Sequence, residues 1–280
     1  MLHHPMIETF VLEENEKKNI TLTAYVASAI DEMPYNYKRP GVIICPGGAY
    51  RGTSNREAEP VAISFLAAGI NAFVLDYSTR FEDEEGKLFP GQFIELATAM
   101  KFVKDNAEKF CTDPDKIFVN GYSAGGHLAA CLGTLHSSSY VKDALGVSDN
   151  ELRPAGMILA YPVITEGEHA HKLSFKIILG DKVDDPEARR AASLEYQVTK
   201  DTCPAFIWHT RTDGGVPVQN SLLLASALAD NGIPFEMHIY PVGPHGMSLA
   251  TDVVNTNHVN CIDSHVAEWF SAAVKWMKNI

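Results

Sequence analysis

The 280-residue sequence predicts an α/β protein with a mainly parallel central sheet and helices on both faces of that sheet. Three observations support this fold class. Short apolar runs, typical of strands buried on both faces, alternate with longer segments whose apolar residues recur at helical spacing. Polar clusters follow several of these runs, where the carboxyl ends of parallel strands commonly form sites. No Pro/Gly/Ser-rich linker divides the chain, so we expect one domain over residues 1–280.

The first half of the chain predicts six elements. Two edge strands joined by a polar turn come first, and the third strand, GVIIC, is a continuous apolar run of the kind buried between two helical layers. The first helix ends at Gly69, because glycine readily adopts the conformation that closes a helix. The second helix carries apolar residues at helical spacing. In chain order, strand, strand, strand, helix, strand and helix cover residues 7–12, 20–27, 41–45, 56–68, 70–75 and 89–110.

The second half continues the alternation of strands and helices. Strand, helix, strand, strand, helix, strand and helix cover residues 117–119, 124–135, 156–161, 205–209, 218–230, 235–240 and 264–277. A less regular region over 162–202 separates the third of these elements from the fourth, and it has one helical piece near 186–194. The alternation is that of a parallel sheet covered on both faces.

Composition and charge exclude several function classes. The formal net charge of −12 argues against nucleic acid and anionic membranes as partners. No stretch approaches the roughly 20 apolar residues of a spanning helix, and the N-terminus lacks the basic and apolar regions of a secretory signal. The five cysteines, too widely spaced for a metal finger, indicate free thiols in a reducing compartment. We therefore expect a soluble, cytoplasmic protein.

A serine stands at a sharp turn between a predicted strand and a predicted helix. Residues 121–125 read GYSAG, which is a complete G-x-S-x-G motif with Ser123 at its centre. In this context the small flanking residues let neighbouring backbone approach closely, and the serine hydroxyl projects from the top of the sheet. The start of the following helix lies beneath it and favours developing negative charge. A Gly-rich turn without chemical function is the alternative.

A nucleophilic serine needs a base, normally a histidine oriented by a carboxylate. His245 is the best candidate among eleven histidines, because it lies in a Gly/Pro-rich loop directly after the strand at 235–240. The carboxylate is expected on the loop after the preceding strand, where Asp213 is the only acid. Asp181 is a competing acid, and a purely turn-forming Asp213 is a further alternative. The chain order is serine, acid, histidine.

The third requirement is a set of donors for the oxyanion. The strand at 41–45 is followed by PGGAY, whose glycines leave backbone N–H groups free and let a carbonyl come close. The N–H of Gly48 or Ala49, together with that of Ala124, is expected to bind the oxyanion of a tetrahedral intermediate.

These features together resemble the α/β-hydrolase superfamily, and within it the bacterial xylan and carbohydrate acetyl esterases and the hormone-sensitive-lipase-like carboxylesterases. The resemblance extends from about Gly41 to the C-terminus. It departs at the oxyanion loop, where Pro46 and GGA stand in place of a histidine and three glycines. The backbone donors survive this change, which favours the xylan esterase branch. The resemblance rests on four segments: CPGGAY at 45–50, GYSAGGHL at 121–128, WHTRTDGGVP at 208–217 and GPHG at 243–246.

The resemblance implies an α/β-hydrolase fold with a small cap-like insertion around 162–202, in which His169 and His171 are candidates for substrate contact. It also implies that Tyr50 and Tyr122 lie beside the substrate. The predicted function is a serine carboxylesterase that hydrolyses short acyl, above all acetyl, esters of carbohydrate such as xylo-oligosaccharide. It requires no metal or organic cofactor, and a homo-oligomer is possible. A prolyl-oligopeptidase-like peptidase and a non-catalytic binding protein on the same fold are the alternatives.

Overall fold

The computed structural model describes residues 6–14, 16, 18–28, 37–81, 84, 89–257 and 260–280. Eight strands form one sheet: β1 Met6–Glu13, β2 Ile20–Val26, β3 Arg39–Cys45, β4 Asn71–Asp76, β5 Thr112–Tyr122, β6 Met157–Ala160, β7 Ala205–Thr210 and β8 Phe235–Tyr240. Their spatial order is β1-β2-β4-β3-β5-β6-β7-β8. The β1–β2 and β2–β4 pairs are antiparallel, and all later pairs are parallel. The sheet is therefore mixed and mostly parallel, as the sequence predicts.

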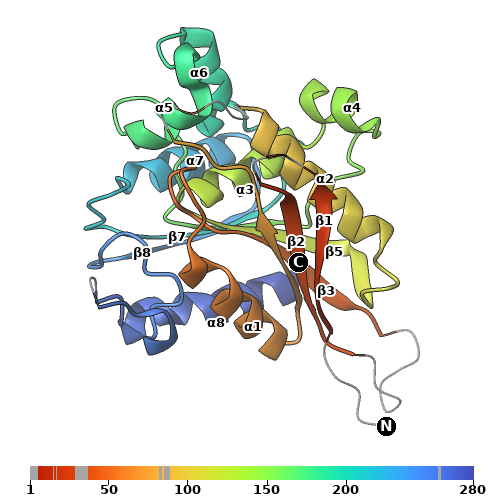
Figure 1. Ribbon diagram of the computed structural model, residues 1–280. Coiled ribbons are helices and arrows are strands. Elements are labelled where there is room, and N and C mark those ends of the chain that lie inside the picture. The colour runs from red at the N-terminus through yellow and green to blue at the C-terminus, as the bar shows by residue number, and fades with distance from the viewer. Residues whose placement is uncertain are drawn as a thin grey trace.

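Eight helices accompany the sheet in the described chain, and both of its faces are covered (Figure 1). One layer contains α2, α3 and α7, and the opposite layer contains α1 and α8. The sheet thus lies between two apolar cores. The helices are α1 Glu59–Ala67, α2 Gly91–Asp105, α3 Ala124–Leu135, α4 Ser139–Leu145, α5 Lys172–Leu179, α6 Pro186–Ala192, α7 Gln219–Asp230 and α8 Ser264–Asn279.

Strand β3 shows why its sequence is a continuous apolar run. Successive side chains of a strand point to opposite faces. Val42 and Ile44 pack in the core on the side of α1 and α8, whereas Ile43 and Cys45 pack in the core on the side of α2, α3 and α7. All four side chains are fully buried. A strand with both faces covered needs apolar residues at every position.

Several predicted elements differ from those observed. Only β1 is an edge strand at the N-terminal end of the sheet, because β2 lies between β1 and β4. The helix predicted from residue 56 begins at Glu59, after a short 3-10 helix, η1 (Asn55–Glu57). Helix α2 is shorter than the predicted 89–110, and β5 is longer than the predicted 117–119.

The sequence did not reveal α4 and α5. Each has eight residues or fewer, and helices this short depend on packing against the rest of the fold more than on local propensity. Region 162–202, between β6 and β7, contains α5 and α6 together with the short 3-10 helices η2 (Gly180–Lys182) and η3 (Leu194–Tyr196).

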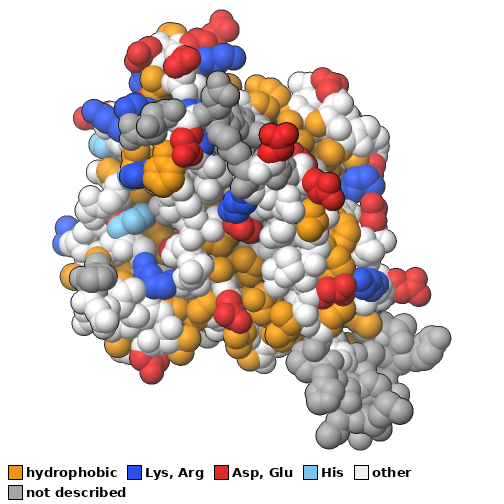
Figure 2. Space-filling model, viewed as in Figure 1, with side chains coloured by type: hydrophobic (Ala, Val, Ile, Leu, Met, Phe, Trp, Pro, Cys, Tyr) orange, Lys and Arg blue, Asp and Glu red, His pale blue; other side chains and the backbone are white. Residues whose placement is uncertain are grey.

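Charged side chains are distributed over the surface rather than gathered. Figure 2 shows acidic and basic side chains interspersed with apolar ones on the face in view. The net negative charge is therefore not concentrated in a single patch on that face. In the described chain, no helix is both long enough and apolar enough to cross a membrane.

Candidate active site

The candidate nucleophile lies in a strained turn. Ser123 joins the end of β5 to the start of α3 with φ 53° and ψ −117°, a left-handed conformation that is costly for a residue with a side chain. A side chain at Gly121 would overlap the carbonyl oxygen of Gly125, and one at Gly125 would overlap that of Cys45. Both glycines of the motif are therefore required by close backbone contacts, as the sequence predicts.

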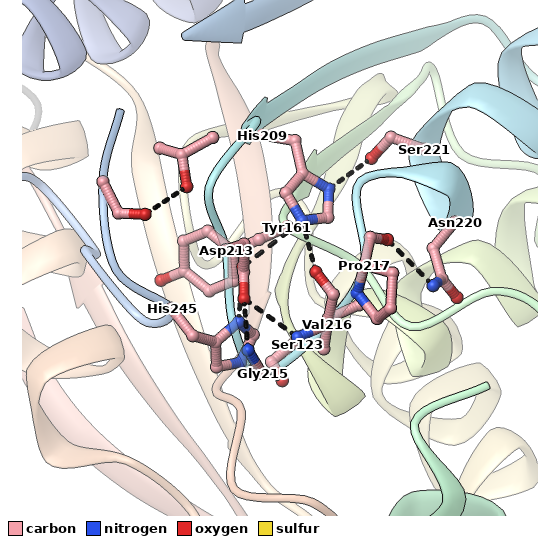
Figure 3. Close-up of polar contacts among 12 residues, drawn as sticks. Ser123, Tyr161, His209, Asp213, Gly215, Val216, Pro217, Asn220, Ser221 and His245 are labelled. Atoms are coloured by element: carbon pink, nitrogen blue, oxygen red, sulfur yellow. Dashed lines mark hydrogen bonds and ion pairs between the residues drawn. The ribbon is translucent and has the colours of Figure 1, made fainter. Parts of the chain in front are cut away.

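Ser123, His245 and Asp213 form a continuous hydrogen-bonded line (Figure 3). His245 Nε2 lies 2.8 Å from Ser123 Oγ, and His245 Nδ1 lies 2.7 Å from Asp213 Oδ2. The carboxylate can only accept, so Nδ1 carries the proton and Nε2 presents its lone pair to the serine hydroxyl. His245 is 28% exposed at its side chain and Asp213 is 0% exposed. Three loops that follow β5, β7 and β8 bring these residues together.

Asp213 is held as an anion by its surroundings. Its Oδ1 accepts from the backbone N–H of Gly215 (2.8 Å) and Val216 (2.9 Å). Burial by itself would raise the pKa of Asp213. Hydrogen bonds from His209 and His245, together with the charge of His245, outweigh burial and hold this pKa well below its usual range. The carboxylate therefore stays ionised beside the imidazole throughout the neutral range.

The candidate oxyanion donors lie on the loop after β3 and at the start of α3. Gly48 and Ala49 both have positive φ, 140° and 55°. Within the described part of the chain, the N–H groups of Gly48, Ala49 and Ala124 have no hydrogen-bond acceptor in the protein. A Cβ built on the neighbouring Gly47 would lie 3.0 Å from Ser123 Cβ, so this loop is packed directly against the nucleophile. The arrangement provides free backbone donors beside the serine.

The sequence matches the model of a known protein family. The model of the BD-FAE family matches residues 32–228, which include Ser123 and Asp213. The chain belongs to the BD-FAE family. His245 lies beyond the matched residues, so the family match does not cover this member of the site.

Relatives of this BD-FAE family member include an endo-1,4-beta-xylanase and an acetylxylan esterase. Endo-1,4-beta-xylanase B of Butyrivibrio fibrisolvens is 38% identical over 215 residues, which are 77% of this chain and 33% of that protein. The acetylxylan esterase of Xylanibacter ruminicola is 31% identical over 224 residues, 78% of this chain and 43% of that protein. The chain thus spans less than half the length of these two relatives.

Solved structures match over nearly the whole chain. The acetyl ester-xyloside bifunctional hydrolase from Caldicellulosiruptor lactoaceticus is 34% identical with a TM-score of 0.81, over 97% of this chain and 96% of that one. The carboxylesterase Cest-2923 from Lactobacillus plantarum is 26% identical with a TM-score of 0.84, over 98% and 97%. These likenesses show that the fold is that of the α/β-hydrolases.

Two predicted substrate contacts are not supported in this BD-FAE protein. Tyr50 is 2% exposed and Tyr122 is 0% exposed, and each packs in an apolar core. The Tyr50 hydroxyl donates to His127 Nδ1 at 2.7 Å, because His127 Nε2 is the donor to the carbonyl of Ala192 (2.8 Å). Burial lowers the pKa of His127 to about 4, so this histidine is neutral. Tyr50 thus supports the oxyanion loop from inside the protein.

His209 is a functional candidate that the sequence alone did not single out. It lies near the end of β7 with no exposed surface, and its Nε2 is 3.3 Å from Asp213 Oδ2 and 3.0 Å from the carbonyl of Val216. Both of these oxygens can only accept, so Nε2 carries the proton and Nδ1 accepts from the hydroxyl of Ser221 at 2.8 Å. Asp213 therefore accepts from two histidines. The sequence signal for this contact is that His209 and Asp213 are four residues apart.

Two other residues that the sequence suggested for the site are Asp181, as the competing acid, and His171, as a substrate contact. Asp181 lies exposed in η2, and His245 is paired with Asp213 instead. His171 precedes α5 and bonds Ser174 Oγ at 2.8 Å. Burial and the charge of the nearby His245 lower the pKa of His171, which places it within electrostatic reach of the site. Within the described ranges, no group of three or more His, Cys, Asp or Glu side chains is arranged to hold a metal ion.

Proposed function

We propose that this protein is a serine carboxylesterase that removes short acyl groups, above all acetyl, from carbohydrate esters such as xylo-oligosaccharides. The observation that carries this proposal is the hydrogen-bonded line from Ser123 Oγ through the His245 imidazole to the Asp213 carboxylate. The substrate class is supported by two relatives whose names refer to acetyl ester or acetylxylan hydrolysis.

The geometry supports a two-step reaction. Neutral His245 takes the proton of Ser123 as Oγ attacks the ester carbonyl, and Asp213 holds the imidazole in the required tautomer. The oxyanion that forms is stabilised by the N–H groups of Ala124 and of Gly48 or Ala49, an effect worth roughly 3 kcal/mol for one donor. The imidazolium then protonates the departing alcohol. Water then attacks the acyl-enzyme carbonyl while it gives a proton to His245, and the imidazolium returns that proton to Ser123 Oγ as the acid leaves.

The experiment compares the purified protein with Ser123→Ala on a panel of esters. The panel contains p-nitrophenyl acetate, butyrate and octanoate, acetylated xylose and xylo-oligosaccharides, and one proline nitroanilide. We expect fast release of acetate from the sugars, slower hydrolysis of longer acyl chains, and loss of both in the variant. Cleavage of the nitroanilide with inert acetate esters would favour a peptidase, and failure of Ser123 to react with a fluorophosphonate would favour a binding protein. Cytoplasmic location stays a prediction.

A further inference from the structure

A second buried carboxylate lies beside the candidate active site and has no part in the proposed reaction. Glu57, at the end of η1, is 3% exposed. Its Oε2 accepts from the N–H of Gly47 at 2.8 Å, and its Oε1 accepts from the hydroxyl of Tyr161 at 2.7 Å. Both donors are neutral groups, and burial raises the pKa of Glu57. The carboxylate is therefore held by hydrogen bonds from two separate loops.

Tyr161 contacts both Glu57 and the loop that carries His245. It directly follows β6 and has φ 38°, a strained value for a residue with a side chain. Its hydroxyl accepts from the backbone N–H of Ser248 at 2.9 Å. Its ring also lies edge-on against the His245 imidazole, with the ring centres 5.1 Å apart. One phenol thus contacts both the imidazole and the backbone three residues after it.

Arg56, the residue before Glu57, also binds the loop that carries His245. Arg56 Nη1 donates to the carbonyl of Gly246 at 3.0 Å, and Ser248 Oγ donates to the carbonyl of Arg56 at 2.7 Å. Two adjacent residues of η1 therefore bind the oxyanion loop, the end of β6 and the histidine loop. These contacts link the loop of the oxyanion donors with the loop of His245, and they do not include the turn of Ser123 or the loop of Asp213.

We propose that Glu57 is a positioning residue for ester hydrolysis. It fixes Gly47, and so sets where the N–H groups of Gly48 and Ala49 lie relative to Ser123, and through Tyr161 it sets the position of the His245 loop. This inference rests on the proposed function. A buried carboxyl is weak evidence for stability, since an apolar side chain of similar size commonly serves as well.

The test separates geometry from stability with two substitutions at one position. Glu57→Ala removes both acceptors, and we expect kcat to fall about 100-fold with KM within about threefold, because displaced oxyanion donors act on the transition state. Glu57→Gln keeps an oxygen for the Gly47 N–H and presents its amide to the Tyr161 oxygen. We expect this variant to recover about tenfold or more of the lost kcat.

Glu95→Ala is the matched control. Glu95 is 2% exposed and accepts from the backbone N–H and the hydroxyl of Ser78, so it resembles Glu57 in burial and bonding. We expect a lower Tm with kcat within about twofold of the wild type, because the loss is one of stability alone. A folded Glu57→Ala variant with wild-type kcat would overturn the proposal, as would equal loss of kcat in Glu57→Ala and Glu57→Gln.

Two further measurements apply if Glu57→Ala does not fold or if the wild type hydrolyses no ester. If Glu57→Ala does not fold, Tyr161→Phe keeps the ring and removes only the hydroxyl, and a kcat unchanged from wild type in both Tyr161→Phe and Glu57→Gln would overturn it. If the wild type hydrolyses no ester of the panel, the proposed function fails by itself. The rate at which a fluorophosphonate labels Ser123 then replaces kcat, because its phosphoryl oxygen occupies the oxyanion position. The expected order is wild type, Glu57→Gln, Glu57→Ala, and equal rates would refute the positioning role.

Discussion

Replacing Asp213 by asparagine tests the proposed mechanism, because the surroundings dictate how the new amide is oriented. The position of Oδ1 faces two backbone N–H groups, those of Gly215 and Val216, which cannot become acceptors. The amide oxygen must therefore stay there, and the NH₂ group faces His245 Nδ1. That nitrogen becomes the acceptor, and the ring proton moves to Nε2, where it points at Ser123 Oγ. The imidazole can then no longer take the serine proton.

The expected loss of kcat in Asp213→Asn follows from the wrong tautomer of His245. In a serine protease the same substitution lowers kcat by about 10⁴, which corresponds to about 5 kcal/mol of barrier. We expect a loss of that order here, because the Asp213 side chain has no exposed surface and its carboxylate contacts His245 Nδ1 directly. His209 keeps its bond to the carbonyl of Val216 at 3.0 Å, so the acid loop should retain its fold.

The assay measures kcat and KM for p-nitrophenyl acetate from pH 5 to 9, with circular dichroism to confirm the fold. Asp181→Asn is the matched control, because Asp181 is the competing acid of the sequence argument and is exposed in η2. Its kcat should equal that of the wild type. If Asp213→Asn retained more than about a tenth of wild-type kcat, or if Asp181→Asn lost activity comparably, the assignment of the acid would be wrong.

Three further predictions follow from the structure. His209→Phe removes a donor that lowers the pKa of Asp213, so this pKa should rise and the loss of stability at low pH should begin at a higher pH than in the wild type, and an unmoved onset would contradict this. Gly125→Ala forces a methyl group into a backbone carbonyl and should cost about 3 kcal/mol or more in thermal unfolding, whereas Gly214→Ala, with nothing within 4 Å, should change little. The lowered pKa of Asp213 contributes stability that is present above the ordinary aspartate pKa, about 3.9, and is lost as pH falls toward the folded value. Denaturant unfolding below about pH 4 should therefore show a steeper loss of stability in the wild type than in Asp213→Asn.

The sequence could predict the line of three residues because each lies just after a strand that its apolar residues reveal. Parallel strands present their carboxyl ends at one edge, so Ser123, Asp213 and His245 meet although distant in the chain. Tyr50 and Tyr122 show the limit of this reasoning. Adjacency to a site residue does not give side-chain direction, and Tyr122, the last residue of β5, points into the core beside α1 and α8.

The contacts of Glu57 could not have been predicted from sequence. Its partners are 10 and 104 residues away, and only the folded chain brings them together. The segment also reads as the start of a helix, which gives an acidic residue an ordinary explanation. By contrast, His209 and Asp213 are four residues apart on one strand and its loop, so that contact was accessible to local reasoning.

Backbone strain in this protein gathers where the chemistry is proposed. Of the eight described residues other than glycine with positive φ, five lie in the loops around Ser123: Ala49, Tyr50, Ser123, Tyr161 and Ser248. Each such conformation costs about 1–3 kcal/mol and persists only where the surroundings leave no alternative. The surroundings here are two apolar cores and the contacts of Glu57, Tyr161 and Arg56. η1 joins three of the four segments that hold this strain: the oxyanion loop, the end of β6 and the histidine loop. Relaxing any one of these three would therefore shift the others, and with them the oxyanion donors and the imidazole that is hydrogen-bonded to Ser123.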